Sequence, residues 1–391
     1  MGALRRRDDH AQRSPDRSGT RTRPRLKACA AGTSSCSRPR AGYGAAVSGD
    51  ASTEPRRPGM RQVAREAGVS PTTVSNVLNS PELVAEETRR RVHAAMERMG
   101  YLPDNAARRL RGMPSPLVGA VTLDIAGPFF TEVCRGVEDR LLQDGCMLMT
   151  CSTDLQPGRE RHYLQELEKQ RVRGVLITPV EADLDPLVSL AGRGVPVVLL
   201  DHRSDGRLCS VSMDNQWGGE QVAAHLITLG HRRIALLSAS IEVQQTVERH
   251  AGVRTAFVKA GLDPGRGVLD VRVPSPDITV TAAAALEDVL GAADPPTAII
   301  CLNDTAALGV IGGLKERGIV VPGEMSVVGY DDVAFAAQLA PSLTTVWQPK
   351  RELGRVAAEL LLDETRPGHR HQKLVYRPRL VVRESTAPPC R

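Results

Sequence analysis

The 391-residue sequence has few aromatic side chains and no long apolar run. Phe, Trp and Tyr together make up 3% of the residues, whereas hydrophobic residues as a whole make up 41%. Aliphatic side chains must therefore pack the interior, and the length suffices for two or three domains with buried cores. Because no stretch of about 18 apolar residues occurs, no membrane span is expected. The N-terminus lacks the apolar segment of a signal peptide, so we expect a cytoplasmic protein.

The sequence also lacks the motifs of common catalytic and metal sites. It contains no G-x-S-x-G, Walker or H-E-x-x-H pattern, so we expect no enzyme and no cofactor. The eight cysteines include no Cys-x-x-Cys pair, which indicates reduced cytosolic thiols rather than a metal or redox site. They stand at positions 29, 36, 134, 146, 151, 209, 301 and 390.

Charge is unevenly distributed along the chain. Residues 1–58 carry a net charge of +8, residues 59–112 carry +3 and the remainder carries −5. This asymmetry is typical of a DNA-binding N-terminal part joined to a body with another task. Residues 1–58 have almost no apolar periodicity and are expected to be disordered. Two interpretations of them remain open: a basic arm that contacts phosphates, or a mis-called start with translation beginning near Val47 or Met60.

The stretch MRQVAREAGVSPTTVSNVLN, residues 60–79, predicts two short helices joined by a tight turn. Apolar residues recur at helical spacing over 61–67 and again over 71–79. Gly68 can take the positive φ that ends the first helix. Ser70 and Pro71 form an N-cap and a first helical residue. Two helices linked by a short turn that contains glycine describe a helix-turn-helix.

The second helix of such a unit presents its N-terminal residues to base edges in the major groove. Asn76 can pair bidentately with adenine, and Thr72 and Thr73 can contact phosphates or a thymine methyl group. The alternative is a helical hairpin inside an ordinary core. The candidate DNA-binding residues of this helix are Ser70, Pro71, Thr72, Thr73, Ser75, Asn76 and Asn79.

The stretch AREAGVSPTTVSNVLN resembles the DNA-reading head of the lac repressor family of bacterial transcription regulators. The likeness continues through TRRRVHAAMERMGYLPDNAARRLRG to VVREST and covers about residues 59–386. It implies an α/β fold class, in which an all-α helix-turn-helix head precedes a two-lobed, periplasmic-binding-protein-like core of doubly wound parallel sheets. The implied parts are the head at 59–104, a hinge helix and linker at 105–116, and an effector-binding and dimerisation domain at 117–386.

The resemblance extends to a third helix and a hinge. The third helix is expected over 86–99, with Ala85 where the family usually has a serine cap, at a cost of about 1 kcal/mol. In the family, the hinge becomes a helix on DNA and pairs with its dimer mate in the minor groove. By resemblance, Leu110 wedges between base pairs and kinks the duplex. Ala107 then approaches the groove floor, while Arg108 reaches a phosphate.

From Leu117 onward, short apolar runs alternate with helical stretches. This alternation predicts parallel sheets covered by helices, arranged as two doubly wound lobes. The resemblance implies a ligand held between the lobes, at the carboxyl ends of the strands. It also implies that the chain crosses between lobes near 213–215, near 347–349 and again close to the C-terminus.

Polar residues directly after predicted strands are candidates for ligand contacts. By resemblance, Arg249 and three of them match positions where the family grips effectors. An arginine that faces Asn and Asp suits the hydroxyls of a sugar, or a purine edge. The alternative for each is helix capping or surface charge. Two aromatic residues are further candidates. Phe129 could stack on a ligand or belong to the core, and Trp347 could form a lid over the ligand. The candidate ligand-binding residues are Asp124, Phe129, Asp201, Arg249, Asn303, Asp331 and Trp347.

The sequence as a whole predicts a sequence-specific DNA-binding transcriptional regulator, a repressor controlled by a small-molecule effector. The effector is expected to be a carbohydrate or a related polar metabolite. The expected partner is a pseudo-palindromic operator in double-stranded DNA, which a homodimer would bind. The alternative is a solute-binding protein of the same core fold without a regulatory role. The helix-turn-helix and the missing signal peptide argue against that alternative.

Overall fold

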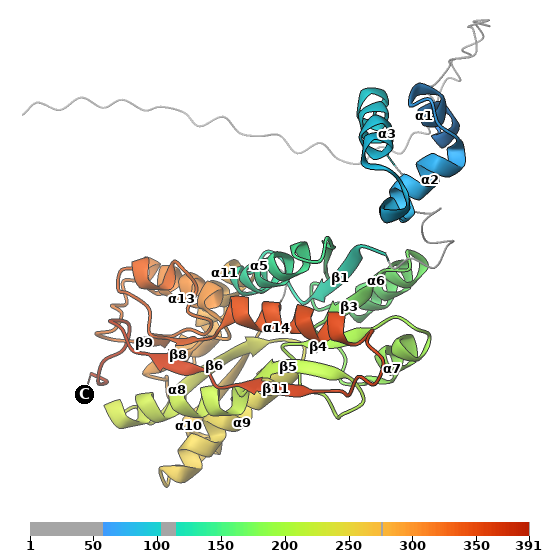
Figure 1. Cartoon of the computed structure of the whole chain (residues 1–391). Helices are drawn as coiled ribbons and strands as arrows, with labels where there is room; N and C mark the ends of the chain where they lie inside the picture. Colours follow the sequence, from blue (N-terminus) through green and yellow to red (C-terminus); the bar gives the residue numbers. More distant parts are fainter. Residues whose placement is uncertain (1–57, 103–114, 275–276, 391) are drawn as a thin grey trace, which may run out of the picture. The chain divides into compact units, whose positions relative to one another are not determined.

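The computed structural model describes residues 58–102, 115–274 and 277–390, which fall into two compact units (Figure 1). The first unit is a small all-helical head within residues 58–102, and the second is an α/β core within residues 115–390. None of the helices in these ranges is long and apolar enough to span a bilayer.

The head contains the three predicted helices around one apolar cluster. Its elements are α1 (Met60–Glu66), α2 (Pro71–Asn79), the 3-10 turn η1 (Pro81–Leu83) and α3 (Glu86–Met99). Gly68 has φ +63° and allows the chain to turn from α1 into α2, as predicted. The buried residues are Val63, Ala64, Ala67, Val74, Val77, Val92, Ala95 and Met96. The predicted period-3.6 faces therefore form the core of the head.

Helix α3 begins without a side-chain cap, as expected from Ala85. Ala85 has φ −54° and ψ 141°, and no side-chain oxygen accepts a hydrogen bond from the first turn. We expect Ala85→Ser to stabilise this helix by about 1 kcal/mol, because serine satisfies one backbone N–H. Amide hydrogen exchange in the first turn of α3 should slow about fivefold. Ala85→Val, which adds a side chain without an oxygen, is the control; equal slowing in both variants would contradict the capping explanation.

The first lobe of the core is a six-stranded parallel sheet in the order β11-β5-β4-β3-β1-β2. Its strands are β1 (Leu117–Thr122), β2 (Met147–Ser152), β3 (Gly174–Ile177), β4 (Val197–Leu200), β5 (Cys209–Met213) and β11 (Lys373–Tyr376). Helices α5 (Pro128–Leu142) and α14 (Lys350–Asp363) share one apolar cluster with the sheet, and α6 (Pro157–Lys169) and α7 (Asp185–Gly192) share another. Helices therefore cover both faces of the sheet.

Two glycines allow α5 and α14 to pack closely. A Cβ atom on Gly136 would lie 2.0 Å from the carbonyl oxygen of Arg351, and one on Gly354 would lie 2.0 Å from that of Val133. Since the obstructing atoms belong to the backbone, neither position has room for a larger residue.

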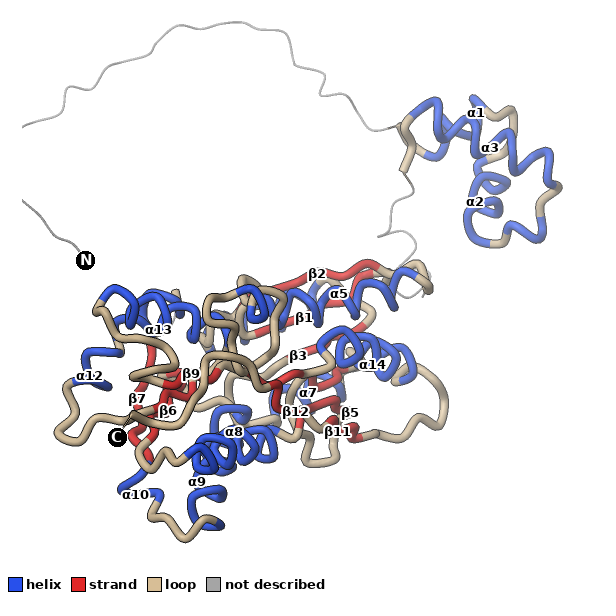
Figure 2. The backbone as a smooth tube through the Cα atoms, turned by 90° about the vertical axis from the view of Figure 1, so that its left-hand side faces the viewer, coloured by secondary structure: helices blue, strands red, loops and turns tan. Residues whose placement is uncertain are grey.

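The second lobe is a four-stranded parallel sheet in the order β7-β6-β8-β9, again with helices on both faces (Figure 2). Its strands are β6 (Ile234–Ala239), β7 (Val268–Val273), β8 (Ala298–Ile300) and β9 (Ser326–Val328). Its helices are α8 (Asn215–Leu229), α9 (Gln244–Lys259), α10 (Pro264–Gly267), α11 (Ile278–Ala284), α12 (Leu286–Leu290) and α13 (Asp304–Glu316). Helices α11 and α12 follow each other directly and meet at Ala285. A short 3-10 turn, η2 (Ala336–Gln338), follows β9.

The chain crosses between the lobes at the three predicted places. It leaves β5 for α8 at 213–215, and it leaves β10 (Thr345–Trp347) for α14 at 347–350. It crosses a third time between β11 and β12 (Arg379–Val381), which pairs antiparallel with β10. The sequence of β5, CSVSM, has serine at every second position and therefore contains no continuous apolar run. In the structure all five of its residues are buried.

Candidate functional site

The exposed N-terminal face of α2 is the candidate DNA-reading surface. Ser70 Oγ accepts a hydrogen bond from the Thr73 backbone N–H at 3.0 Å and lies 2.9 Å from Thr73 Oγ1. These two side chains therefore cap the helix and fix where it starts. The side chains of Pro71, Thr72 and Asn76 lie on the exposed surface of the helix. Together with Ser70, they are the predicted contact residues of this helix that the fold leaves exposed.

The end of α2 holds the remaining predicted residues of this helix in local contacts. Asn79 Nδ2 donates hydrogen bonds to the Ser75 carbonyl at 2.7 Å and to Ser75 Oγ at 3.1 Å. The Asn79 amide thus stabilises the last turn of its own helix. The hinge candidates Ala107, Arg108 and Leu110 lie outside the residues that the structure describes.

A cavity of about 510 Å³ lies between the two lobes of the core. Its volume is typical of small-molecule sites, which commonly measure about 300–1,000 Å³. Loops at the carboxyl ends of parallel strands from both sheets contribute to its wall, which is where open α/β sheets bind ligands. The predicted ligand residues that line it are Asp124, Phe129, Asp201, Arg249, Asn303 and Asp331.

Arg249 is held by three elements of the second lobe. Its Nε donates to Asn215 Oδ1 at 3.0 Å and its Nη1 donates to the Leu302 carbonyl at 2.8 Å. Its guanidinium carbon lies 3.5 Å from the centre of the Tyr330 ring, which is a cation–π contact. Arg249 stands in the second turn of α9, not at the start of that helix. These contacts fix the guanidinium at the wall of the cavity.

Two buried carboxyl groups face the same cavity, Asp201 and Asp331. Burial raises the pKa of each carboxyl to about 7, and the nearby Arg249 charge lowers it in part. Asp331 Oδ1 accepts a hydrogen bond from Gln348 at 2.7 Å. Asp201 Oδ1 has no hydrogen-bond partner among the residues that the structure describes. A buried carboxyl oxygen without a donor is costly, so this atom is a natural acceptor for a ligand hydroxyl.

Asp124 and Asn303 line the cavity and also serve their own loops. Asn303 Oδ1 accepts from the Ala306 N–H at 2.8 Å and caps α13. Asp124 is exposed, and its Oδ1 accepts from the Ala126 N–H at 2.9 Å. Both residues therefore make a local hydrogen bond in their own loop and also line the cavity. Phe129 is likewise a core residue at the start of α5, in an edge-to-face pair with Phe130 at 5.0 Å.

Trp347, the predicted lid, is not among the described residues that line the cavity. It lies opposite Arg379 in the antiparallel pair of β10 and β12. The Arg379 guanidinium carbon lies 4.4 Å from the centre of the indole ring.

The prediction missed Gln245, which does line the cavity. Its Nε2 donates to the Asp201 carbonyl at 2.5 Å, and its Oε1 has no hydrogen-bond partner within the described part of the chain. The available signal was its spacing, since Gln245 stands one helical turn before Arg249 on the same face.

Comparison with known proteins identifies both units. The family described as bacterial regulatory proteins, lacI family, matches residues 59–104, and the periplasmic binding protein-like domain matches residues 223–386. The HTH-type transcriptional repressor PurR of Photobacterium profundum is 34% identical over 330 residues, covering 83% of this chain and 98% of that protein. The PurR repressor of Vibrio campbellii is 35% identical over 333 residues, with the same coverage of both chains.

Solved structures agree with these sequence relatives. The lac repressor dimer bound to operator and the anti-inducer ONPF has a TM-score of 0.72 and 27% identity, covering 85% of this chain and all of that one. A LacI-family regulator from Enterococcus faecium with bound ribose has a TM-score of 0.64 and 29% identity, covering 70% of this chain and 99% of that one. The CelR–cellobiose complex has a TM-score of 0.61 and 30% identity, covering 84% and 100%. The chain therefore belongs to the lacI family of bacterial regulatory proteins and is a DNA-binding transcriptional repressor with a periplasmic-binding-protein-like core.

Proposed function

We propose that this repressor acts as a homodimer on a pseudo-palindromic operator and that a sugar or related polar metabolite, bound between the lobes, controls its affinity. The observation that carries the proposal is the cavity in which Arg249 faces two buried carboxyl groups. In this scheme the head is 59–104, the hinge and linker are 105–116, and the effector and dimerisation domain is 117–386. Such a protein acts in the cytoplasm, where its operator is.

The charges in the cavity favour a neutral polyhydroxyl ligand. A hydroxyl group can donate to Asp201 Oδ1 or Asp331 and accept from Arg249 at the same time. An anionic ligand would instead meet two carboxyl groups for one guanidinium. Two structural relatives hold ribose and cellobiose, which supports a carbohydrate for this chain as well. The edge of a purine base is the second candidate, because it also offers donors and acceptors side by side.

Control of the operator requires an effector that binds two states of the core with different affinity. We infer that effector binding changes the angle between the lobes and thereby the spacing of the two hinges in the dimer. Leu110 is proposed as the residue that wedges between base pairs, with Ala107 at the groove floor and Arg108 on a phosphate. Only the lobe arrangement that aligns both hinges would hold the heads on adjacent half-sites, about one helical turn apart.

A mobility-shift titration on the DNA that flanks the gene tests this function. We expect the full chain to shift a fragment with an inverted repeat in the presence of non-specific competitor DNA. Adding ribose, cellobiose or purine bases in turn should change the midpoint of that titration for one class of compound. Binding that disappears with competitor or moderate salt, with and without these compounds, would reduce the interaction to phosphate attraction alone.

Asn76→Ala is expected to weaken operator binding by about 1–3 kcal/mol and to relax preference at one base pair of each half-site. The reason is that Asn76 is exposed on α2 and its amide can pair with adenine. Competition among operators with single base-pair changes measures the effect. His93→Ala is the control, because His93 is an exposed residue of α3 that is not among the candidate contacts; it should leave base preference unchanged. A uniform loss of affinity on all sequences for Asn76→Ala would contradict direct readout.

A further inference from the structure

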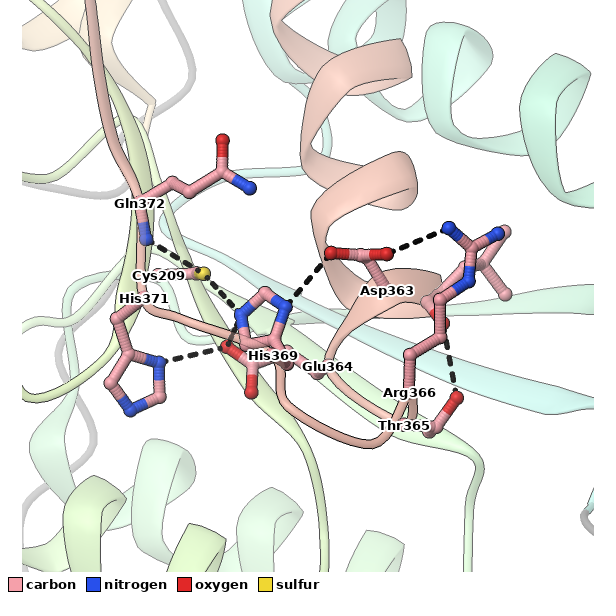
Figure 3. Close-up of polar contacts among 9 residues, drawn as sticks. Cys209, Asp363, Glu364, Thr365, Arg366, His369, His371 and Gln372 are labelled. Carbon is pink, nitrogen blue, oxygen red and sulfur yellow. Dashed lines mark hydrogen bonds and ion pairs between the residues drawn. The ribbon is translucent and has the colours of Figure 1, made fainter.

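Four side chains suited to metal binding meet at the start of β5, outside the cavity. Cys209, Glu364, His369 and His371 each offer one ligand atom, and these atoms lie within 4.8 Å of one another (Figure 3). Cys209 begins β5, whereas the other three belong to the segment that joins α14 to β11. The sequence analysis expects no metal site because no Cys-x-x-Cys pair occurs. In this cluster the single cysteine and His369 are 160 residues apart in the chain. Only the fold brings them together.

Three of the six distances between the ligand atoms are close to those around one tetrahedral ion, and all six are within 4.8 Å. Cys209 Sγ lies 3.2 Å from His369 Nε2, which lies 3.3 Å from Glu364 Oε1. The same Glu364 oxygen lies 3.2 Å from His371 Nδ1. In a tetrahedral zinc site with bonds of about 2.0–2.3 Å, neighbouring ligand atoms lie roughly 3.3–3.6 Å apart. The observed separations are within a few tenths of an ångström of these values.

Outer contacts orient two of the four ligands. His369 Nδ1 lies 2.9 Å from Asp363 Oδ2, so its Nε2 faces Cys209 and Glu364. A carboxylate on the far nitrogen is the usual support of a metal-bound histidine. Asp363 is held in turn by Arg366 at 2.8 Å. The Gln372 backbone N–H donates to Cys209 Sγ at 3.2 Å, which stabilises a thiolate.

Burial distinguishes an inner and an outer side of the cluster. The side chains of His369 and Glu364 are 6% and 11% exposed, and Cys209 is fully buried. His371 is 41% exposed and stands where an ion can enter from solvent. The buried ligands exclude water from most of the site, while the exposed one leaves it accessible.

We propose that Cys209, Glu364, His369 and His371 form a structural zinc site. A thiolate with two imidazoles and one carboxylate suits Zn²⁺, whereas Mg²⁺ and Ca²⁺ take oxygen ligands. The ion joins the segment 364–372 to the start of β5. That segment leads directly into β11, the edge strand that pairs with β5 through Lys373 and Ser210. The metal therefore fastens the edge of the first sheet at the end opposite the lobe crossings.

Cobalt binding to the full chain tests the site. Protein stripped with a chelator is titrated with Co²⁺, a spectroscopic substitute for zinc. We expect one equivalent to bind with the absorption of a tetrahedral, thiolate-ligated ion and to be displaced by Zn²⁺. Cys209→Ser should lose the thiolate-to-cobalt band. The matched controls, Cys390→Ser and His162→Gln, change exposed residues outside the cluster and should keep the band and the affinity.

Two further variants keep the test decisive if Cys209→Ser fails to fold. His371→Gln removes a half-exposed ligand and should weaken Co²⁺ binding at least tenfold. Asp363→Asn leaves every ligand in place and should weaken binding about 10- to 100-fold through His369. Zinc should also raise the melting temperature of the wild type more than that of either variant. Absence of a thiolate band in the wild type, or its persistence in Cys209→Ser, would overturn the proposal.

Discussion

Arg249→Ala is expected to abolish the response to the effector while operator binding without effector is retained. Arg249 is the only cationic side chain among the described residues that line the cavity. A hydrogen bond from a charged group to a ligand contributes about 1.5–3 kcal/mol, and the guanidinium can donate more than one. We therefore expect effector affinity to fall at least about 100-fold. The measurement is the effector concentration that shifts half of the operator complex.

The same substitution removes the positive charge next to two buried carboxyl groups. The Arg249 charge lowers the pKa of both Asp201 and Asp331, so its loss raises both pKa values further above their usual range. At neutral pH these carboxyls then become protonated and the cavity stays folded without an uncompensated charge. This is why operator binding, which depends on the head, is expected to survive.

Two variants separate the role of the guanidinium from that of charge. Arg249→Lys keeps the charge but cannot hold Asn215 Oδ1 and the Leu302 carbonyl with one planar group, so a partial loss of response is expected. Arg254→Ala changes an exposed arginine on the same helix that does not line the cavity, and it should respond as the wild type does. An unchanged midpoint in Arg249→Ala would exclude Arg249 from effector binding.

Local signals in the sequence predict the head and most of the parallel strands. The helical spacing of Val63, Val74 and Val92 and the turn at Gly68 depend on neighbours in sequence, and the structure confirms them. The continuous apolar runs of β3, β4 and β6 are equally local, since both faces of each strand are buried. In contrast, β5 buries Ser210 and Ser212, and no local pattern indicates that these serines lie inside a sheet.

The candidate cavity is predictable where strand ends and family resemblance coincide, as for Asp201, Asn303 and Asp331. It is not predictable where a side chain acts through a distant partner. Gln245 lines the cavity because it bonds the Asp201 carbonyl, 44 residues away. Trp347 contacts the Arg379 guanidinium, because β10 pairs with β12, and no sequence motif encodes that strand pairing. The Cys209 cluster depends on the same kind of long-range pairing, between β5 and β11.

Asp201→Asn is expected to stabilise the protein in a pH-dependent way. Burial raises the pKa of Asp201 to about 7 in the folded protein, from an ordinary value near 3.8. Between these values the folded state holds a proton that the unfolded state has lost. The stability that this carboxyl contributes is therefore fully present below about pH 4 and is lost as pH rises through 7. Asparagine has no charge to bury at any of these pH values.

The advantage of asparagine should consequently be smallest at acid pH and grow toward neutrality. One pKa unit corresponds to 1.36 kcal/mol, so the difference in free energy of unfolding should grow by about 2–3 kcal/mol between pH 5 and pH 8. Urea unfolding of both proteins across this range measures it. Asp124→Asn is the matched control, because it removes an exposed carboxylate from the same wall; it should not reproduce the stabilisation expected for the buried Asp201.

The same variant should lose effector affinity, because Asp201 Oδ1 is a buried acceptor in the cavity wall that has no donor among the described residues. An amide can present a nitrogen or a neutral oxygen there, and neither replaces a carboxylate as acceptor for a ligand hydroxyl. Increased stability together with lost response is the result expected of a residue kept for binding at a cost in folding energy. If Asp201→Asn is stabilised at pH 8 and still responds to effector, the carboxyl is a buried charge without a role in the site. If the difference in stability between the two proteins does not change with pH, the pKa of Asp201 in the folded protein equals its ordinary value, and the pKa argument fails.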